Sequence, residues 1–289
     1  MDLSCAPISH YPRIRMPLYK QFARRLEAAE ELAGASVARA HRASIPGSHA
    51  ETLAVGGGTA IFVEPGSPIS QCIGCGVTRP VTEAEVEQIE RFYFSRGHGS
   101  QIVVSRTFAH ELESTLAARG YQVVEQNLAF YLELPWNNVP SVPEEYEIRE
   151  IAWQERERWA ELQSNSFFDD PQQAAEFVSI FLLVAGSEGY RCYVAVDRAT
   201  GEFAAGAAIY ISGEERIACI AGAATRAAHR RRGLQAAMLQ RRLVDATDAG
   251  CDVAFMSTLL ETTSCRNAER QGFVRGYERA VMVKPRLAP

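Results

Sequence analysis

The sequence lacks the features that would place the protein in a membrane or outside the cell. No run approaches the roughly 18 consecutive apolar residues that a membrane-spanning helix needs. Residues 1–17 contain no apolar stretch of the kind found in a secretion signal. The seven cysteines are odd in number and scattered, which favours reduced thiols over a disulfide framework. We therefore expect a cytoplasmic protein without a membrane partner.

The sequence also lacks an excess of positive charge. Its formal net charge is −5 and its isoelectric point is near 5.8. A general nucleic-acid binder needs a basic face to neutralise phosphates. The acidic composition therefore argues against a nucleic-acid partner. The short arginine run at 230–232 does not change this expectation, because the surrounding composition is acidic.

A metal-binding pattern is missing as well. Cys72 and Cys75 form a CxxC pair, but no second pair and no nearby histidine would complete a tetrahedral zinc site. This stretch reads as a strand, in which residues three apart point to opposite faces and so could not share a ligand. We expect no metal.

The sequence does contain enough material for two mixed α/β domains. Its 289 residues are long for one domain, and its 47% hydrophobic and 22% charged residues are ordinary for globular proteins. Residues 135–143, with three prolines and two asparagines, are the expected linker. We therefore predict one domain over residues 1–139 and a second over residues 140–289.

Hydrophobic periodicity predicts the secondary structure of the second domain. The expected strands are 146–150, 190–197, 203–211, 217–224, 253–258 and 274–284. The expected helices are 153–163, 171–185, a helix from 234 to the Ala249-Gly250 stop, and 264–271.

The second domain is organised around the segment 225–237. An apolar strand leads into a basic loop, and a helix starts at Leu234. A helix start presents free backbone N–H groups and the positive end of the helix dipole, which together bind phosphate. Gly233 permits close approach of the ligand, and Arg230, Arg231 and Arg232 add cationic donors. The segment predicts a phosphate-binding loop.

Arg230-x-x-Gly233 between a strand and a helix resembles the acetyl-CoA pyrophosphate loop, Arg/Gln-x-x-Gly-x-Gly/Ala, of the GNAT (GCN5-related N-acetyltransferase) superfamily. Gln235 departs from that pattern, because Gly or Ala usually stands there. The segment 267–273, which ends in Gly272-Phe273, is similar to the last motif of the family, and the element order above is the GNAT order. The resemblance implies an α/β fold with a mixed, mostly antiparallel sheet flanked by helices.

The first half of the sequence contains an internal repeat of this pattern. A helix, Arg119-Gly120-Tyr121 and a strand repeat the later helix, Gln271-Gly272-Phe273 and strand. We therefore expect two GNAT-like units, each with its own sheet. The first is degenerate: the counterpart of the phosphate loop, residues 77–85, has no Arg-x-x-Gly, and a Thr82/Glu85 capping box with Glu83 places negative charge where pyrophosphate would sit. The first half is not expected to bind CoA.

The resemblance implies that acetyl-CoA is the co-substrate and that an acetyl group passes directly to a primary amine of a small molecule in a ternary complex. The alternative is a non-catalytic acyl-CoA-binding regulatory module, favoured by Ala268 standing where many family members have the tyrosine acid. Ser264 is our candidate substitute for that acid, with Asn267 as an alternative. The expected cofactor-binding residues are Ala223, Ala224, Thr225, Arg230, Arg231, Arg232, Gly233, Leu234, Gln235, Ala236 and Asn267.

The acceptor is expected to meet the loop that follows the helix at 153–163. Phe168, Asp169 and Asp170 are the candidate acceptor-binding residues, with a carboxylate attracting a cationic amine. Asp170 before Pro171 is also a good helix N-cap, so a purely structural role remains an alternative. His229 is interpreted as a solvated loop residue rather than a base. We expect a monomer or a homodimer.

Overall fold

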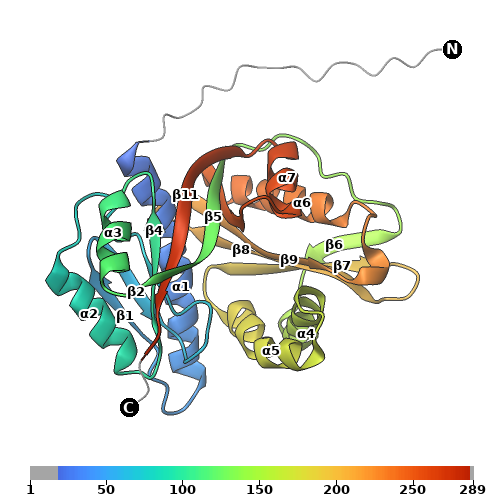
Figure 1. Cartoon of the computed structure of the whole chain (residues 1–289). Coiled ribbons are helices and arrows are strands. Elements are labelled where there is room, and N and C mark those ends of the chain that lie inside the picture. Colours follow the sequence, from blue (N-terminus) through green and yellow to red (C-terminus); the bar gives the residue numbers. More distant parts are fainter. Residues whose placement is uncertain (1–18, 287–289) are drawn as a thin grey trace.

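The strands form one continuous sheet. The computed structural model describes residues 19–286, and within them eleven strands follow the order β1-β2-β3-β4-β11-β5-β10-β9-β8-β7-β6 (Figure 1). The mixed α/β class is confirmed. The expectation of two units with separate sheets is wrong, because internal similarity reveals which elements repeat but not which strands become neighbours.

The first half of the chain supplies α1 and the strands at one end of the sheet. Its elements are α1 (Lys20–Ser44), β1 (Glu51–Val55), β2 (Gly58–Phe62), β3 (Cys72–Ile73), α2 (Glu83–Phe94), β4 (Ser100–Ser105), α3 (His110–Ala118) and β5 (Gln122–Glu133). The capping box at α2 is confirmed, since the Glu85 N–H donates to Thr82 Oγ1 at 3.3 Å and the Thr82 N–H donates to Glu85 Oε2 at 2.9 Å. A hydrogen bond from Arg79, together with these contacts, lowers the pKa of Glu85 to about 2.

The second half contains every element expected for it. These are β6 (Tyr146–Glu150), a short 3₁₀ turn (Trp153–Glu155), α4 (Arg156–Phe167), α5 (Pro171–Gly186), β7 (Tyr190–Asp197), β8 (Phe203–Ser212), β9 (Ile217–Thr225), a second 3₁₀ turn (Ala227–His229), α6 (Leu234–Asp248), β10 (Val253–Leu259), α7 (Thr263–Arg270) and β11 (Val274–Lys284).

The last strands of the two halves are exchanged. β5, from the first half, lies between β10 and β11 of the second, and β11 lies between β4 and β5 of the first. Residues Leu128 to Leu132 of β5 are all buried, whereas an edge strand or a half-exposed strand would alternate. Such a continuous apolar run needs cover on both faces and a partner on both edges. The halves therefore share one core.

Helices cover both faces of the sheet. Helices α1, α4 and α5 lie on one face, and α2, α3, α6 and α7 lie on the other (Figure 1). The alternation along β5 shows this arrangement directly: Tyr131 packs with Phe22 of α1, whereas Phe130 and Leu132 pack with Leu239 of α6. Because α1 packs on strands of both halves, it spans the junction between them.

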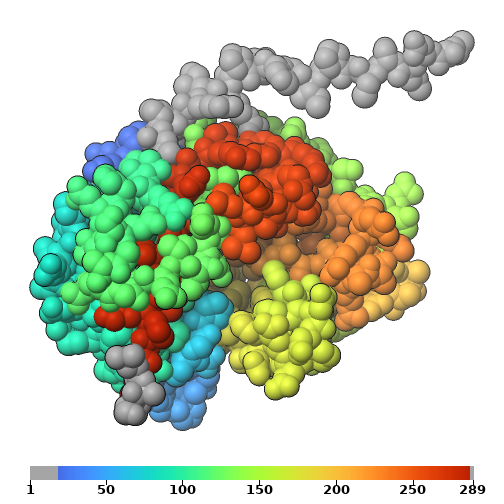
Figure 2. All heavy atoms as spheres, viewed as in Figure 1, coloured from blue at the N-terminus to red at the C-terminus, as the bar shows by residue number. Residues whose placement is uncertain are grey.

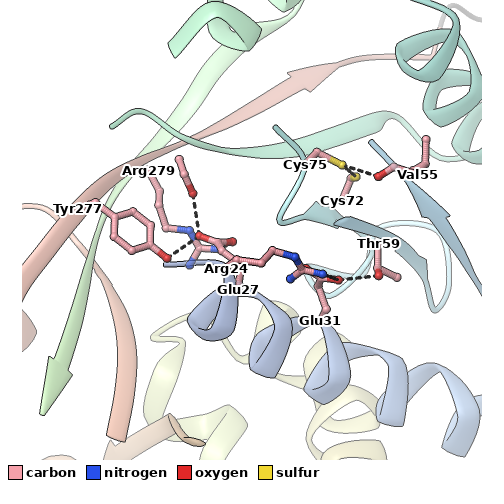
Figure 3. Close-up of polar contacts among 10 residues, drawn as sticks. Arg24, Glu27, Glu31, Val55, Thr59, Cys72, Cys75, Tyr277 and Arg279 are labelled. Carbon is pink, nitrogen blue, oxygen red and sulfur yellow. Dashed lines mark hydrogen bonds and ion pairs between the residues drawn. The ribbon is translucent and has the colours of Figure 1, made fainter. Parts of the chain in front are cut away.

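A buried ionic cluster joins α1 to the exchanged strand β11. Glu27 and Arg279 are 0% and 2% exposed. Glu27 accepts hydrogen bonds from Tyr277 Oη at 2.7 Å and Ser105 Oγ at 2.8 Å, and its Oε2 lies 3.3 Å from Arg279 Nη2 (Figure 3). Arg279 Nη1 lies 2.7 Å from Glu30 Oε2. Burial by itself would lower the pKa of Arg279, but Glu27 and Glu30 outweigh it and raise that pKa.

The two cysteines of the CxxC pair lie together, contrary to expectation. β3 ends at Ile73, and Gly74 turns the chain with φ of +77°, so the Sγ atoms of Cys72 and Cys75 are 2.9 Å apart (Figure 3). Both thiols are buried, and burial raises the pKa of Cys72. Within residues 19–286, no group of three or more His, Cys, Asp or Glu side chains is arranged to hold a metal ion. The helices of the same region are all too short or too polar to cross a membrane.

Removing the charge of Arg279 should strongly destabilise the fold. Arg279→Met leaves Glu27 buried without its cation, which typically costs about 3–5 kcal/mol in the free energy of unfolding. Urea unfolding followed by circular dichroism measures this. The matched control is Arg275→Met on the same strand, because the Arg275–Glu269 ion pair is exposed and such pairs contribute under about 1 kcal/mol. Equal losses in the two variants would show that the buried cluster does not hold α1 to β11.

Candidate functional site

The site begins where two parallel strands diverge. β9 and β10 pair only from Ile217 and Val253 to Cys219 and Phe255. Beyond that point β9 follows β8, and β10 follows β5. A cavity of about 870 Å³ opens along this fork. Figure 2 shows the hollow between α4–α5, in yellow, and α6–α7, in orange and red. Its volume suits a cofactor-sized ligand.

The floor of the cavity contains a β-bulge. The register between β8 and β9 changes from Ala208↔Ala221 to Gly206↔Ala224, so that Gly222 and Ala223 together face one residue of β8. Gly222 has a φ of +48°. A bulge of this kind redirects backbone groups that would otherwise pair along the ladder.

Two side chains hold the bulge from opposite faces of the sheet. Gln163 of α4 donates from Nε2 to the Gly222 carbonyl at 2.5 Å. Arg242 of α6 donates from Nη1 to the carbonyls of Ala208 and Ala221 at 2.9 and 3.0 Å. Neither residue was found from the sequence, because periodicity places Arg242 on the buried face of its helix without indicating what a buried arginine would bind there.

The start of α6 is open to an anion. Gly233 occupies the N-cap position with φ of +79°, and no side chain caps the first turn. By contrast, Thr82 and Glu85 cap α2, the counterpart in the first half. Arg230 donates from Nε to the Thr225 carbonyl at 3.1 Å, and Arg231 has an uncommon φ of +63°. The local geometry therefore combines free helix N–H groups, a glycine and two arginines.

Most of the predicted cofactor residues meet in this cavity. Its walls include Ala223, Ala224, Thr225, Arg230, Arg231, Gly233, Leu234, Gln235, Ala236, Asn267 and the predicted acid Ser264. Arg232 is exposed and does not line it. The structure thus brings together segments 223–236 and 264–267, while the binding roles of these residues remain predictions.

Gln235, the departure from the family pattern, connects the two helices beside the cavity. Its Oε1 accepts a hydrogen bond from Asn267 Nδ2 of α7 at 2.6 Å. Arg270 in turn donates to Asn267 Oδ1 at 3.2 Å. A glycine or alanine at position 235 could not make this contact.

The predicted acceptor residues do not line the cavity. Asp170 caps α5, accepting hydrogen bonds from the N–H groups of Gln172 and Gln173 at 2.8 and 3.0 Å. Phe168 packs on Phe177, with ring centroids 4.5 Å apart. Ser166 and Phe167, the last two residues of α4, precede them and do reach the cavity. An acceptor role for Phe168, Asp169 and Asp170 stays a prediction, and the structural alternative for Asp170 is confirmed.

His229 is buried, not solvated as expected. It is 8% exposed and lines the cavity. Its Nδ1 and the Tyr146 hydroxyl share a hydrogen bond of 2.9 Å, and its Nε2 lies 3.8 Å from Glu202 Oε2. No local pattern indicates this burial, because the partner Tyr146 lies far away in the chain.

The cavity is cationic and holds unused hydrogen-bonding groups. Arg230, Arg231, Arg242 and Arg270 line it, and none of its described lining residues is an aspartate or glutamate. The hydroxyl oxygens of Ser166 and Ser257, both lining residues, are buried without a hydrogen-bond partner among the residues described. Such groups are costly to leave unpaired, so they are suited to a polar ligand.

Comparison with known proteins agrees with this geometry. Residues 145–273 match the model of the acetyltransferase (GNAT) family. The structure is similar to a GCN5-related N-acetyltransferase from Kribbella flavida (17% identity, 89% of this chain and 95% of that one, TM-score 0.65). It is also similar to one from Sphaerobacter thermophilus (17%, 71% and 68%, TM-score 0.56) and to a tandem GNAT protein from the clavulanic acid biosynthesis pathway (16%, 79% and 74%, TM-score 0.54). At these identities the likeness concerns the fold. The sequence matches none of the curated proteins with which it was compared.

Proposed function

Residues 145–273 belong to the GNAT acetyltransferase family, and from this premise we propose that the protein transfers an acetyl group from acetyl-CoA to a primary amine of a small molecule. The observation that carries the proposal is the cavity in the β9–β10 fork, which runs to an uncapped helix start with Gly233 and two arginines. At one end of the cavity lie the free N–H groups of the first turn of α6, which we call the phosphate seat. At the other end lies the backbone of the β-bulge at Gly222–Ala223.

The predicted cofactor residues follow one path through the site. The pyrophosphate would be bound by the first turn of α6 with Arg230 and Arg231, and the pantetheine arm would lie along Ala223–Thr225. The thioester would then reach the bulge at Gly222. Backbone N–H groups at the bulge would donate to its carbonyl and polarise it, while Gln163 and Arg242 hold the neighbouring backbone carbonyls in place. Proximity and electrostatic stabilisation would then favour attack.

The reaction needs two proton movements. The amine lone pair forms the new C–N bond, the C–S bond breaks, the nitrogen loses a proton and the thiolate gains one. Because none of the described lining residues is a carboxylate, a water molecule would take the first proton. Ser264 is the predicted donor of the second, in place of the tyrosine that is absent at Ala268.

The first half would serve as a structural partner without its own cofactor. Its counterpart of the phosphate loop is occupied by Glu85, which accepts hydrogen bonds from the Thr82 N–H at 2.9 Å and the Gly56 N–H at 3.3 Å. A carboxylate already holds the N–H groups that a phosphate would use. We propose residues 140–289 as the cofactor-binding half and 1–139 as the half that completes its sheet and core.

Gly233→Val should weaken acetyl-CoA binding at least tenfold, about 1.4 kcal/mol, because the side chain obstructs the phosphate seat. Isothermal titration calorimetry measures it. A valine at φ of +79° also strains the backbone, and Gly250→Val controls for this strain. Gly250 has the same φ, lies after the other end of α6, and has no neighbouring atom within 4 Å of the point that a Cβ would occupy. Equal affinity in the two variants would contradict the phosphate seat.

Catalysis itself is tested by incubation of the wild type with acetyl-CoA and a panel of primary amines. We expect amine-dependent release of free CoA thiol, measured with a thiol-reactive dye. Tight binding of acetyl-CoA with no release above the amine-free rate for any acceptor would favour the alternative, a non-catalytic acyl-CoA-binding module.

One acetyl-CoA should bind per chain, and Arg230→Glu should abolish that binding. The glutamate places a carboxylate beside the phosphate seat, as Glu85 does in the first half. Arg232→Glu makes the same charge change at an exposed position outside the cavity and should cost much less affinity. Calorimetry gives the stoichiometry and both affinities. Two equivalent sites, or a full site surviving in Arg230→Glu, would mean that the first half binds cofactor.

A further inference from the structure

Arg242 is a buried cation at the floor of the cavity with donors to spare. It is 2% exposed and lines the cavity from the middle of α6. Nε donates to the Met238 carbonyl at 3.1 Å, and Nη1 donates to the two bulge carbonyls described above. A guanidinium has five N–H donors. The two on Nη2 find no acceptor among the residues described.

The charge of Arg242 has no counter-ion within the described chain. None of the ion pairs formed within residues 19–286 includes Arg242. Arg279, the other fully buried arginine, has both Glu27 and Glu30 beside it. Burial lowers the pKa of Arg242 to about 10, which leaves it protonated at neutral pH. A buried charge without a partner is strongly unfavourable, so the site is incomplete without an anion.

The pyrophosphate cannot be that anion. Arg242 follows Leu234, the first residue of α6, by eight positions, which places it about 12 Å along the helix axis from the phosphate seat. It lies instead at the bulge, where Nη1 donates to the carbonyls of Ala208 and Ala221. If the cofactor lies as proposed above, this is the end of the cavity that holds the acyl group and the acceptor.

We propose that Arg242 binds a carboxylate carried by the substrate. The carboxylate belongs either to the acyl group, as in the monothioester of a dicarboxylic acid, or to the acceptor, as in an amino acid. A simple ammonium would enter a cavity whose described lining contains four arginines and no carboxylate. A substrate carboxylate would instead accept hydrogen bonds from the two Nη2 donors of Arg242. This inference rests on the proposed function and deepens it.

The acyl arm of the test compares succinyl-CoA with butyryl-CoA, which has the same chain length without the carboxylate. The acceptor arm compares amino acids with their amides, using acetyl-CoA as donor and thiol release as the readout. We expect the carboxylated member of one pair to be favoured at least tenfold, in affinity for the acyl arm or in kcat/KM for the acceptor arm. Whichever arm shows the preference identifies the source of the carboxylate.

Variants then assign the preference to Arg242. Arg242→Gln should abolish it, and Arg242→Lys should keep part of it. Arg270→Gln should weaken both members of a pair equally, because Arg270 ends α7 and donates to Asn267 rather than to the bulge. If Arg242→Gln fails to fold, Arg242→Lys replaces it, and an undiminished preference in Arg242→Lys would then contradict the role of Arg242. No preference in either arm, or a preference that survives Arg242→Gln, overturns the inference. Failure of every CoA thioester to bind would instead remove the proposed function.

Discussion

Strands β5 and β11 are exchanged between the two halves of the chain, and their pairing joins the halves into one sheet. Each strand ends one half of the chain and pairs with strands of the other, so neither half has a complete sheet alone. The β9–β10 fork lies at this junction, because β10 diverges from β9 while remaining paired to β5 along its whole length. A segment from the half without a phosphate loop therefore shapes the site in the other half. α1 reinforces the junction through the buried contact between Glu27 and Arg279.

The two buried arginines, Arg279 and Arg242, differ in how their charges are compensated. Arg279 is neutralised by Glu27 and Glu30, and its contacts are those of a structural element that joins a helix to a strand. Arg242 is equally buried, but its partners are backbone carbonyls and its charge remains uncompensated at a cavity wall. A protein can tolerate the desolvation of such a charge more easily where a ligand supplies the missing anion.

The bulge of β9 links fold to chemistry. Gly222 and Ala223 interrupt the ladder where the two strands separate, and Gln163 and Arg242 fix the freed carbonyls from helices on opposite faces. Holding these carbonyls also fixes the adjoining backbone N–H groups of the bulge, and acyl transfer gains most from donors already aimed at the reacting carbonyl. A glycine at position 206 on the neighbouring strand fits this geometry, since an added Cβ would lie 2.9 Å from Gln163 Oε1 and would force the Gln163 side chain to shift.

Local patterns in the sequence predict the helices and strands and the uncapped start of α6. Periodicity and capping patterns reveal features that depend on neighbouring residues. These are the order of strands and helices over residues 146–284, the Thr82 capping box, the Asp170 cap and the open helix start after Gly233. Only the tertiary structure decided what depends on distant segments. Four features require contacts or turns that local patterns do not encode. They are the exchanged strands, the burial of His229 against Tyr146, the proximity of Cys72 and Cys75, and the position of Arg242 at the fork. The physical reason is that strand pairing and burial are set by the competition among all apolar surfaces of the chain, which no single segment determines.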